Sequence, residues 1–290
     1  MKKLALIYNP VSGKAEFKHR LDEIIQKFQE RDCVIIPYRT TPDNASLADF
    51  LKEINPDGLI SAGGDGTLHE MINLVMKEKL GLPIGIIGSG TSNDFATYLD
   101  LDTEAYFDRI AKGVTKRIDL GKAGDEYFIN VASAGMATAI AHEVDVRLKN
   151  AIGKLAYYIH GISSLPRFKA MNLHIKTDND EFDVKAFLFL IVNSSTVASF
   201  KDVAADANID DGVMDLLVVK QCSMPELMTL TAELMTGKTG ISNQSNVMYL
   251  QSATFEVSSE DELDSDLDGE LGPKLPLKVE TVPLAIELYV

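Results

Sequence analysis

The feature that most constrains the fold is a regular alternation of short apolar runs and amphipathic segments over residues 1–118. The apolar runs have the length of buried strands and cover residues 4–8, 33–38, 58–61 and 84–87. Apolar residues recur at helical spacing over residues 15–30, 44–54 and 68–77. Strands that alternate with helices form βαβ units around a parallel sheet. We therefore predict an α/β, doubly wound domain over residues 1–118.

The chain changes character after this domain. Most of the remaining segments have strand patterns between Asp, Asn and Gly turns, and they cover residues 118–120, 127–132, 173–176, 184–192, 213–219, 248–257 and 276–280. Helical patterns interrupt them at 137–164 and 224–235, and a last strand over 284–290 is expected to join either domain. We predict a β-rich second domain over residues 119–290.

Charge and composition exclude several functions. The net charge of −15 argues against a nucleic-acid partner, and it restricts any contact with an anionic membrane to a local patch. Cys33 and Cys222 have no metal-ligand spacing, so we expect two reduced thiols. No apolar run approaches the ~18 to 20 residues of a membrane span. These features favour a cytoplasmic globular protein.

The strongest motif for chemistry is the turn Gly63-Gly64-Asp65-Gly66-Thr67, which joins a strand to a helix. Its glycines permit a tight turn and close approach of a ligand. Thr67 and Glu70 have the spacing of a capping box, which would begin the helix directly after the glycines. A helix N-terminus in this position suits a phosphate, whereas Asp65 would require a cation such as Mg²⁺ or a hydrogen-bonded role. The alternative is an ordinary strand-to-helix turn.

Two further loops follow strands of the same predicted sheet. Residues 9–14 read Asn-Pro-Val-Ser-Gly-Lys, which lacks the spacing of a Walker A loop and is a weak signal alone. Residues 88–96 again place glycines before helix-capping residues. Because the carboxyl ends of parallel strands meet at one edge of a sheet, we expect all three loops to converge on one nucleotide site.

Two acidic segments lie in the second domain. Residues 264–270 begin like a calcium-binding EF-hand loop, but Leu275 stands where the bidentate Glu is required. The alternatives are a solvated acidic loop, or a strand end at which one carboxylate takes a proton from a substrate hydroxyl and another helps to hold Mg²⁺. Residues 208–213 are a turn signal ahead of a strand, and the sequence by itself assigns them nothing more.

Together these segments resemble the catalytic domain family of diacylglycerol kinases, in particular its bacterial lipid kinases without membrane spans. The resemblance covers nearly the whole chain. It is carried by Asn9-Pro10-x-Ser12-Gly13, Gly63-Gly64-Asp65-Gly66-Thr67, Gly90-Thr91-x-Asn93-Asp94-Phe95-Ala96 and Leu267-Asp268-Gly269-Glu270. It implies a Rossmann-like nucleotide domain, similar to those of NAD kinases and diacylglycerol kinases, followed by a β-sandwich-like lipid domain.

The resemblance also implies site residues. Glu270 would be the general base, supported by Asp268, with Asp65 in the surrounding carboxylate network. ATP would contact Asn9, Pro10, Val11, Ser12, Gly13, Thr40, Gly63, Gly64, Asp65, Gly66, Thr67, Leu68, His69, Gly90, Thr91, Asn93 and Asp94. A structural Mg²⁺ would be held by Asp211 and by the carbonyls of Asn208 and Val213. Asn44 stands where the family often has glycine, which leaves the choice between Thr40 and Thr41 open.

The expected function is transfer of the γ-phosphate of ATP to a lipid hydroxyl, with diacylglycerol giving phosphatidic acid, as in phospholipid biosynthesis. Two alternatives are an NAD kinase-like enzyme and a catalytically silent nucleotide- or lipid-binding regulator. The expected cofactors are ATP and Mg²⁺, and the expected partner is a membrane lipid reached by transient local contact. The protein would be peripheral at the inner face of the membrane during turnover. The oligomeric state is open, with a homodimer among the options.

Overall fold

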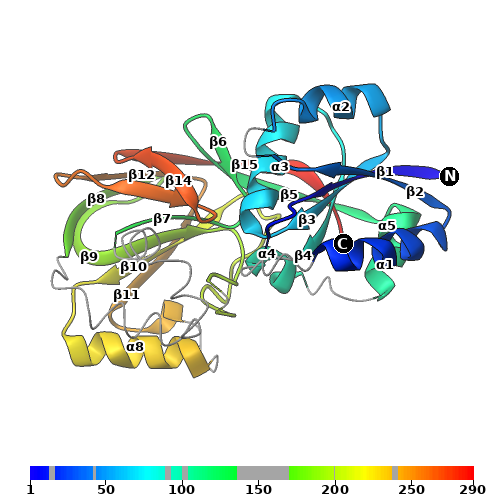
Figure 1. Ribbon diagram of the computed structural model, residues 1–290. Helices are drawn as coiled ribbons and strands as arrows, with labels where there is room; N and C mark the ends of the chain where they lie inside the picture. The colour runs from blue at the N-terminus through cyan, green and yellow to red at the C-terminus, as the bar shows by residue number, and fades with distance from the viewer. Residues whose placement is uncertain are drawn as a thin grey trace.

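The computed structural model describes residues 1–12, 17–41, 44–88, 93–99, 104–135, 170–198, 200–236 and 241–290 (Figure 1). The predicted α/β fold with a β-sandwich-like second part is confirmed. Within these residues the strands form one continuous sheet, in the order β14-β13-β7-β9-β8-β12-β15-β4-β3-β1-β2, with β5, β6, β10 and β11 attached beside this path.

The first part of the chain forms the parallel end of this sheet. Its strands pair in the order β2-β1-β3-β4, and all three pairings are parallel. The strands are β1 (Lys2–Tyr8), β2 (Cys33–Arg39), β3 (Gly58–Gly63) and β4 (Ile84–Gly88). Every residue of β3 is buried, as expected for a central strand that is covered on both faces. This arrangement brings the carboxyl ends of all four strands to one edge.

Helices cover both faces of this parallel region. Figure 1 shows α2 and α3 on one face and α1 and α5 on the other. The helices are α1 (Phe17–Gln29), α2 (Leu47–Ile54), α3 (Asp65–Lys77), α4 (Asp94–Tyr98) and α5 (Glu104–Lys112). The sequence patterns did not predict α5. It buries Tyr106, Phe107 and Ile110, and Asp108 pairs with Arg31 at 2.5 Å.

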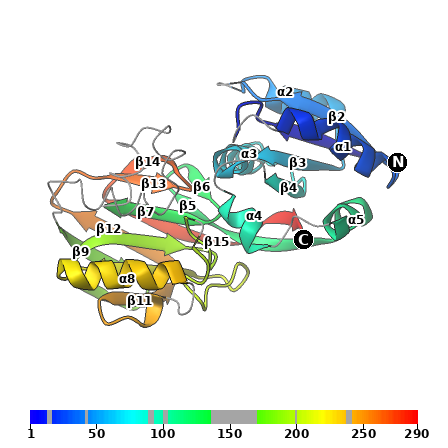
Figure 2. The same cartoon turned by 60° about the horizontal axis from the view of Figure 1, so that its bottom comes forward.

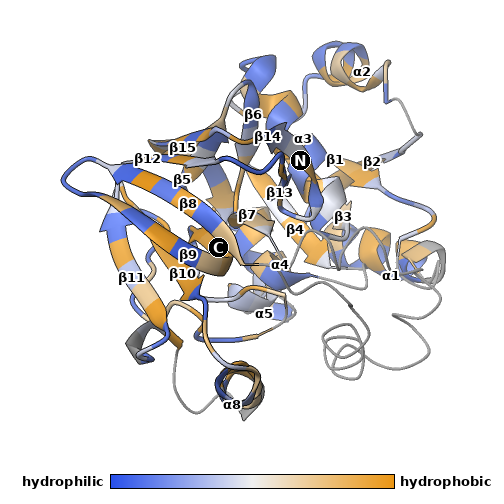
Figure 3. Cartoon of the chain, turned by 90° about the vertical axis from the view of Figure 1, so that its left-hand side faces the viewer, coloured by the Kyte–Doolittle hydropathy of each residue, from blue (hydrophilic) through white to orange (hydrophobic). Residues whose placement is uncertain are grey.

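The second part is made of antiparallel strands. They are β5 (Thr115–Ala123), β6 (Glu126–Phe128), β7 (Val131–Gly135), β8 (Met171–Thr177), β9 (Glu181–Val192), β10 (Met214–Lys220), β11 (Val247–Ser252), β12 (Thr254–Ser259), β13 (Asp264–Leu267), β14 (Glu270–Lys274) and β15 (Leu277–Tyr289). Hydrophilic and hydrophobic residues alternate along β8, as Figure 3 shows, and the burial of its residues alternates in the same way. One face of this strand therefore packs on a core and the other faces water.

Strands β9 and β10 each contribute side chains to two different cores. On β9, Phe189 and Ile191 belong to a core inside the sandwich, while Leu190 and Val192 belong to a second core. Helix α8 (Met224–Thr236) covers the second core through Leu227 and Leu230. Figure 2 shows α8 along the side of β9 and β11, away from α3. Here β9 is buried on both faces, so its end reads as a continuous apolar run.

Strand β15 connects the two parts of the sheet. It pairs with β12 and β5 in antiparallel fashion, and Leu288 near its end pairs in parallel with Ile84 of β4. The register between β15 and β5 shifts between Val282 and Ile286. The segment 284–290 is thus the end of one long strand that returns to the first domain. The proposed boundary at 118/119 falls inside β5 and stays a prediction.

Some sequence predictions of individual elements need correction. The expected strand 248–257 is two strands, because the Asp178 carboxylate accepts hydrogen bonds from the backbone N–H groups of Ala253 and Thr254 and turns the chain there. The two strands then pair with different neighbours, β11 with β10 and β12 with β8. The expected helix 137–164 lies outside the described residues. Among the described helices, none is long and apolar enough to cross a membrane.

One prediction concerns Asp119 of β5, which is fully buried. Its carboxylate accepts hydrogen bonds from the N–H groups of Gly212 and Leu284, each at 2.7 Å, and so ties β5 to the 208–213 turn and to the irregular part of β15. Asp119→Ala removes a fully buried carboxylate and, with it, the acceptor of both N–H groups, and we expect a loss of roughly 2 to 4 kcal/mol in the free energy of unfolding. Urea unfolding measures this value.

The control is Asp22→Ala on an exposed position of α1, which should change stability by less than about 0.5 kcal/mol. Equal stabilities of the Asp119→Ala and Asp22→Ala proteins would contradict this role of Asp119.

Candidate active site

The ends of the parallel strands approach one another around the first turn of α3. Asn9 directly follows β1; its backbone N–H donates to Ala62 O at 3.0 Å, and its Nδ2 lies 3.5 Å from Thr67 Oγ1. Thr40 directly follows β2, and its N–H donates to Tyr8 O at 3.0 Å. The structure therefore brings Asn9, Thr40 and the 63–67 turn to the same edge of the sheet.

Helix α3 begins at Asp65, three residues earlier than a capping box at Thr67 requires. Gly64 is the N-cap residue, no side chain caps it, and Glu70 instead accepts a hydrogen bond from Asn44 Nδ2 at 2.9 Å. The capping-box prediction is therefore wrong. The helix N-terminus is left open toward the strand ends, and the N–H groups of a first helical turn have no partners within the helix. Gly63 is required here, because a Cβ would overlap the Thr67 side chain.

Asn44 has a backbone conformation that few residues adopt. Its φ is 43°, in the left-handed region that asparagine tolerates better than most residues. Its Oδ1 accepts from Thr41 N–H at 2.9 Å, while its Nδ2 binds Glu70. Asn44 therefore joins this loop to α3. Thr40 is half-buried and Thr41 exposed, and which of them contacts a nucleotide stays a prediction.

The Asp65 carboxylate at the start of α3 binds the backbone at the start of α4. The backbone N–H of Asp94 donates to both oxygens of Asp65, at 3.0 and 3.2 Å. Burial, together with the charge of Asp94, raises the pKa of Asp65 to about 7, and these hydrogen bonds only partly oppose the shift. A carboxyl group with this pKa holds a proton that a nearby cation would displace.

The third part of the site is a tight hairpin between β13 and β14. Leu267 and Glu270 pair across it, so that Asp268 and Gly269 form a two-residue loop. Both loop residues have positive φ, 54° and 95°, as in a type I′ turn. Asp-Gly is a preferred sequence for such a turn, and Gly269 N–H also donates to Asp266 Oδ1 at 2.8 Å. The hairpin holds Glu270 at the first position of β14.

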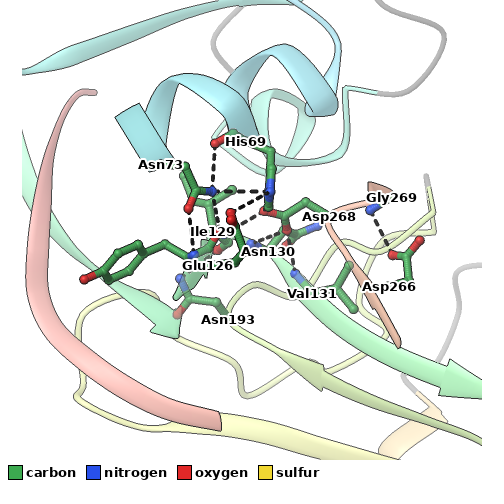
Figure 4. A network of polar contacts seen from close by, with 11 residues as sticks. His69, Asn73, Glu126, Ile129, Asn130, Val131, Asn193, Asp266, Asp268 and Gly269 are labelled. Atoms are coloured by element: carbon green, nitrogen blue, oxygen red, sulfur yellow. Dashed lines mark hydrogen bonds and ion pairs between the residues drawn. The ribbon is translucent and has the colours of Figure 1, made fainter. Parts of the chain in front are cut away.

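The Asp268 carboxylate holds this hairpin against the rest of the protein (Figure 4). Oδ1 accepts from the N–H groups of Asn130 and Val131, each at 2.9 Å. Oδ2 accepts from Ile129 N–H at 2.9 Å and lies 3.2 Å from His69 Nδ1. Four contacts therefore satisfy both oxygens. Through them the carboxylate joins the hairpin to α3 and to the start of β7.

Glu270 lies beside the first turn of α3. A Cβ at position 66 would overlap Glu270 Oε1, so a larger residue there would force the carboxylate to move. Glu270 is exposed, in contrast to buried Asp268. Its charge also contributes to raising the pKa of Glu70, although burial is the larger cause. The arrangement places an accessible carboxylate next to an open helix N-terminus.

His69 lies between these elements. Its ring is buried, with Nδ1 toward Asp268 and Nε2 3.3 Å from Asn73 Nδ2. Burial lowers the pKa of His69, but the carboxylates of Asp268, Glu126 and Glu270 outweigh this effect and raise it. Both ring nitrogens already have partners within the protein. Its expected contact with ATP stays a prediction.

Comparisons with known proteins show which family this chain resembles. Residues 3–123 match the family described as "Diacylglycerol kinase catalytic domain", and residues 130–290 match the "YegS C-terminal NAD kinase beta sandwich-like domain". A diacylglycerol kinase of Staphylococcus saprophyticus is 35% identical over 99% of this chain and 95% of its own length. One from Staphylococcus epidermidis is 34% identical over 99% and 92%.

The chain belongs to the diacylglycerol kinase family. It is a lipid kinase, as the sequence resemblance implied. A crystal structure of a diacylglycerol kinase from Bacillus anthracis superimposes with a TM-score of 0.79 over 99% of this chain and 96% of that one. At 23% identity, this match shows the shared fold alone.

Several predicted site residues of this lipid kinase remain untested. Gly13, Gly90 and Thr91 lie outside the described residues. In the 208–213 turn, Asn208 and Asp211 are exposed, and Asp211 Oδ1 accepts from Val213 N–H at 3.1 Å. No cluster of three or more His, Cys, Asp or Glu side chains suited to a metal occurs in the part of the chain that the structure describes. The Mg²⁺ site at this turn stays a prediction.

The sequence predictions did not include the polar residues that hold the hairpin in place. Asn73 binds the backbone of Tyr127, and Asn130 binds Thr196 O at 2.9 Å and Ser194 Oγ at 2.6 Å. Asn73 was visible as the polar residue that interrupts the apolar run 71–76, one turn after His69. The Asp268-Gly269 pair between strand-like segments was a recognisable hairpin signal. Asn130 had no local signal, because its partners are more than sixty residues away.

The pKa of Asp65 gives a prediction about stability in the absence of nucleotide and divalent cations. Between pH 3.8 and about 7 the folded state holds a proton that the unfolded state releases, so this group makes the protein less stable as pH rises through that range. Asp65→Asn removes the effect. We expect the variant and the wild type to be equally stable near pH 4, and the variant to be more stable by roughly 2 kcal/mol at pH 8.

Urea unfolding at several pH values in EDTA measures this difference, with Asp22→Asn as the exposed control. A stability difference between Asp65→Asn and wild type that does not change with pH would contradict the assignment.

Proposed function

We propose that this lipid kinase transfers the γ-phosphate of ATP to the hydroxyl of diacylglycerol and so forms phosphatidic acid. The observation that carries the proposal is the contact between Glu270 and Gly66. It places a solvent-accessible carboxylate against the helix turn that is suited to bind phosphate. A base beside a phosphate site is what transfer to a hydroxyl group requires.

The nucleotide would bind along the strand ends. The first turn of α3 supplies backbone N–H groups and the positive end of the helix dipole, which favour the phosphates of ATP. Thr67 and Asn9 lie within 3.5 Å of each other at this turn and offer a hydroxyl and an amide. Gly63 leaves room for the Thr67 side chain at this turn, and Gly66 leaves room for the Glu270 carboxylate. Thr40 lies at the neighbouring strand end, where it would contact the adenosine.

Glu270 would act as the general base. As its carboxylate takes the proton of the lipid hydroxyl, the hydroxyl oxygen forms a bond to the γ-phosphorus. The bond between that phosphorus and the oxygen that bridges it to the β-phosphate breaks, and ADP leaves. Asp268 cannot easily share this task, because four donors surround its oxygens. Its role would be to hold Glu270 in position.

Asp65 and Asp94 are suited to hold a magnesium ion. Burial, and after it the charge of Asp94, raises the pKa of Asp65, and a divalent cation bound there would favour the ionised carboxylate. Mg²⁺ bound there would neutralise negative charge on the phosphates. A second, structural ion at Asn208, Asp211 and Val213 remains part of the proposal; its ligands would be the oxygens that Mg²⁺ prefers.

The acceptor must come from a membrane, whereas the net charge is −15. We therefore propose a transient local contact with the inner membrane face rather than broad electrostatic attachment. NAD is the competing acceptor to test, because the second domain matches a family named for its likeness to NAD kinase. Sphingoid bases and phosphatidylglycerol are competing lipids with a free hydroxyl.

The direct test is a transfer assay with γ-labelled ATP and diacylglycerol in mixed micelles, with NAD, a sphingoid base and phosphatidylglycerol in parallel. We expect label in phosphatidic acid. Glu270→Gln should lower the turnover number by about 10² to 10⁴, because proton abstraction is lost while ATP binding and the melting temperature are kept.

The matched control is Glu262→Gln, a 90% exposed glutamate of the same region that should retain wild-type turnover. Transfer to NAD in preference to every lipid, or ATP binding with no phosphorylated product, would overturn the proposed function. Wild-type turnover by Glu270→Gln would overturn the assignment of the base.

A further inference from the structure

Helix α3 carries a polar stripe that faces the second domain. His69, Asn73 and Lys77 follow one another at intervals of four residues and therefore lie in one line along the helix. His69 contacts Asp268, Asn73 contacts Tyr127, and Lys77 pairs with Glu126 at 2.7 Å. Leu68 and Ile72, which are buried, each precede a residue of the stripe by one position and therefore lie beside it around the helix. This stripe joins the phosphate-binding helix to β6 and to the Glu270 hairpin.

Asn73 makes the most specific contacts of the stripe, and it is 6% exposed. Its Nδ2 donates to Tyr127 O at 2.8 Å, and its Oδ1 accepts from Tyr127 N–H at 2.9 Å. Because a backbone N–H only donates and a backbone carbonyl only accepts, this pair of bonds fixes which end of the amide carries the nitrogen. The orientation of the amide therefore does not depend on His69.

The fixed amide in turn orients His69. Asn73 Nδ2 lies 3.1 Å from His69 O and 3.3 Å from His69 Nε2, so a donor faces that ring nitrogen. In the neutral ring, a nitrogen that faces a donor serves as an acceptor, and the single ring proton then lies on Nδ1, toward Asp268 Oδ2. The chain of contacts runs from Tyr127 through Asn73 and His69 to Asp268, which immediately precedes Gly269 and Glu270 in the hairpin (Figure 4).

We infer that Asn73 is a positioning residue for phosphoryl transfer: it orients His69 toward Asp268 and thereby fixes Glu270 at the first turn of α3. This inference rests on the proposed role of Glu270 as base. Asn73 itself lies two turns from Gly66 along α3 and would touch neither ATP nor the lipid. Its loss should lower the rate of the chemical step without weakening nucleotide binding, because a base that is displaced by about 1 Å can cost about 10²-fold in rate.

Lys77 supplies a matched control on the same stripe. It also joins α3 to β6, but its partner Glu126 is exposed at the surface, and among the described contacts neither side chain binds Asp268 directly. Lys77→Ala removes this contact between α3 and β6. It keeps every hydrogen-bonding group on the path from Tyr127 to Asp268, and it keeps Glu126, which lies 4.0 Å from His69 Nε2. If any loss of contact between α3 and β6 lowered activity, Lys77→Ala would do so as well.

The experiment compares wild type, Asn73→Ala and Lys77→Ala in the transfer assay with diacylglycerol, well below the melting temperature of each protein. We expect the turnover number of Asn73→Ala to fall between about 10-fold and 100-fold, with the KM for ATP changed less than about 3-fold. Lys77→Ala should match wild type in both constants. If Asn73→Ala does not fold, Asn73→Ser keeps a hydroxyl for one of the hydrogen bonds to Tyr127. We predict for it the same fall in turnover number with little change in the KM for ATP.

A double-mutant cycle with Glu270→Asp tests whether the effect passes through the base. The aspartate side chain is one methylene shorter, so the base is already displaced in Glu270→Asp. In that background, Asn73→Ala should lower the turnover number further by less than about 3-fold. Multiplicative losses, or a change confined to the KM for ATP, would overturn the inference, as would wild-type turnover by Asn73→Ala. If Glu270→Gln is itself fully active, the proposed function of Glu270 fails, and this is distinguishable from a failure of Asn73 alone.

Discussion

The arrangement of the site depends on one buried carboxylate. Asp268 accepts three backbone N–H groups from residues 129–131 and a contact from the ring of His69. A buried charge is tolerated only when its oxygens are satisfied, and here the donors come from two separate parts of the chain. Losing any of them would leave the charge underpaired, so Asp268 holds the hairpin, β7 and α3 in one fixed arrangement. The position of Glu270 follows from this.

The site also contains a group that opposes folding. The pKa of Asp65 is raised to about 7 because burial and Asp94 both disfavour its charge. The two acidic residues thus differ, because hydrogen-bond donors satisfy the oxygens of Asp268 but only partly offset the burial of Asp65. Perturbed pKa values of this kind are common at functional sites. In the proposed mechanism, Asp65 and Asp94 would hold Mg²⁺, which would neutralise charge on the phosphates of ATP.

Much of the fold could be predicted from the sequence, because its signals are local. The strands and helices of residues 1–88 follow from apolar periodicity. The glycine-containing loops directly follow predicted strands, which places the site at the strand ends. The contacts that place Glu270 could not be predicted in this way. Asp268 meets His69 across 199 residues of sequence, and Asn73 meets Tyr127 across 54. The start of α3 was also misplaced, since the Thr67 and Glu70 spacing matched a capping box while Glu70 in fact binds Asn44.

The proposed mechanism requires that Glu270 faces the phosphate that is transferred. A crystal structure of the protein with Mg²⁺ and a non-hydrolysable ATP analogue measures this directly, through the separation of the γ-phosphorus from the Glu270 carboxylate. We predict a γ-phosphate at the first turn of α3, with room for one hydroxyl group between it and Glu270. A γ-phosphate bound elsewhere, or a Glu270 carboxylate turned away from it, would contradict the account.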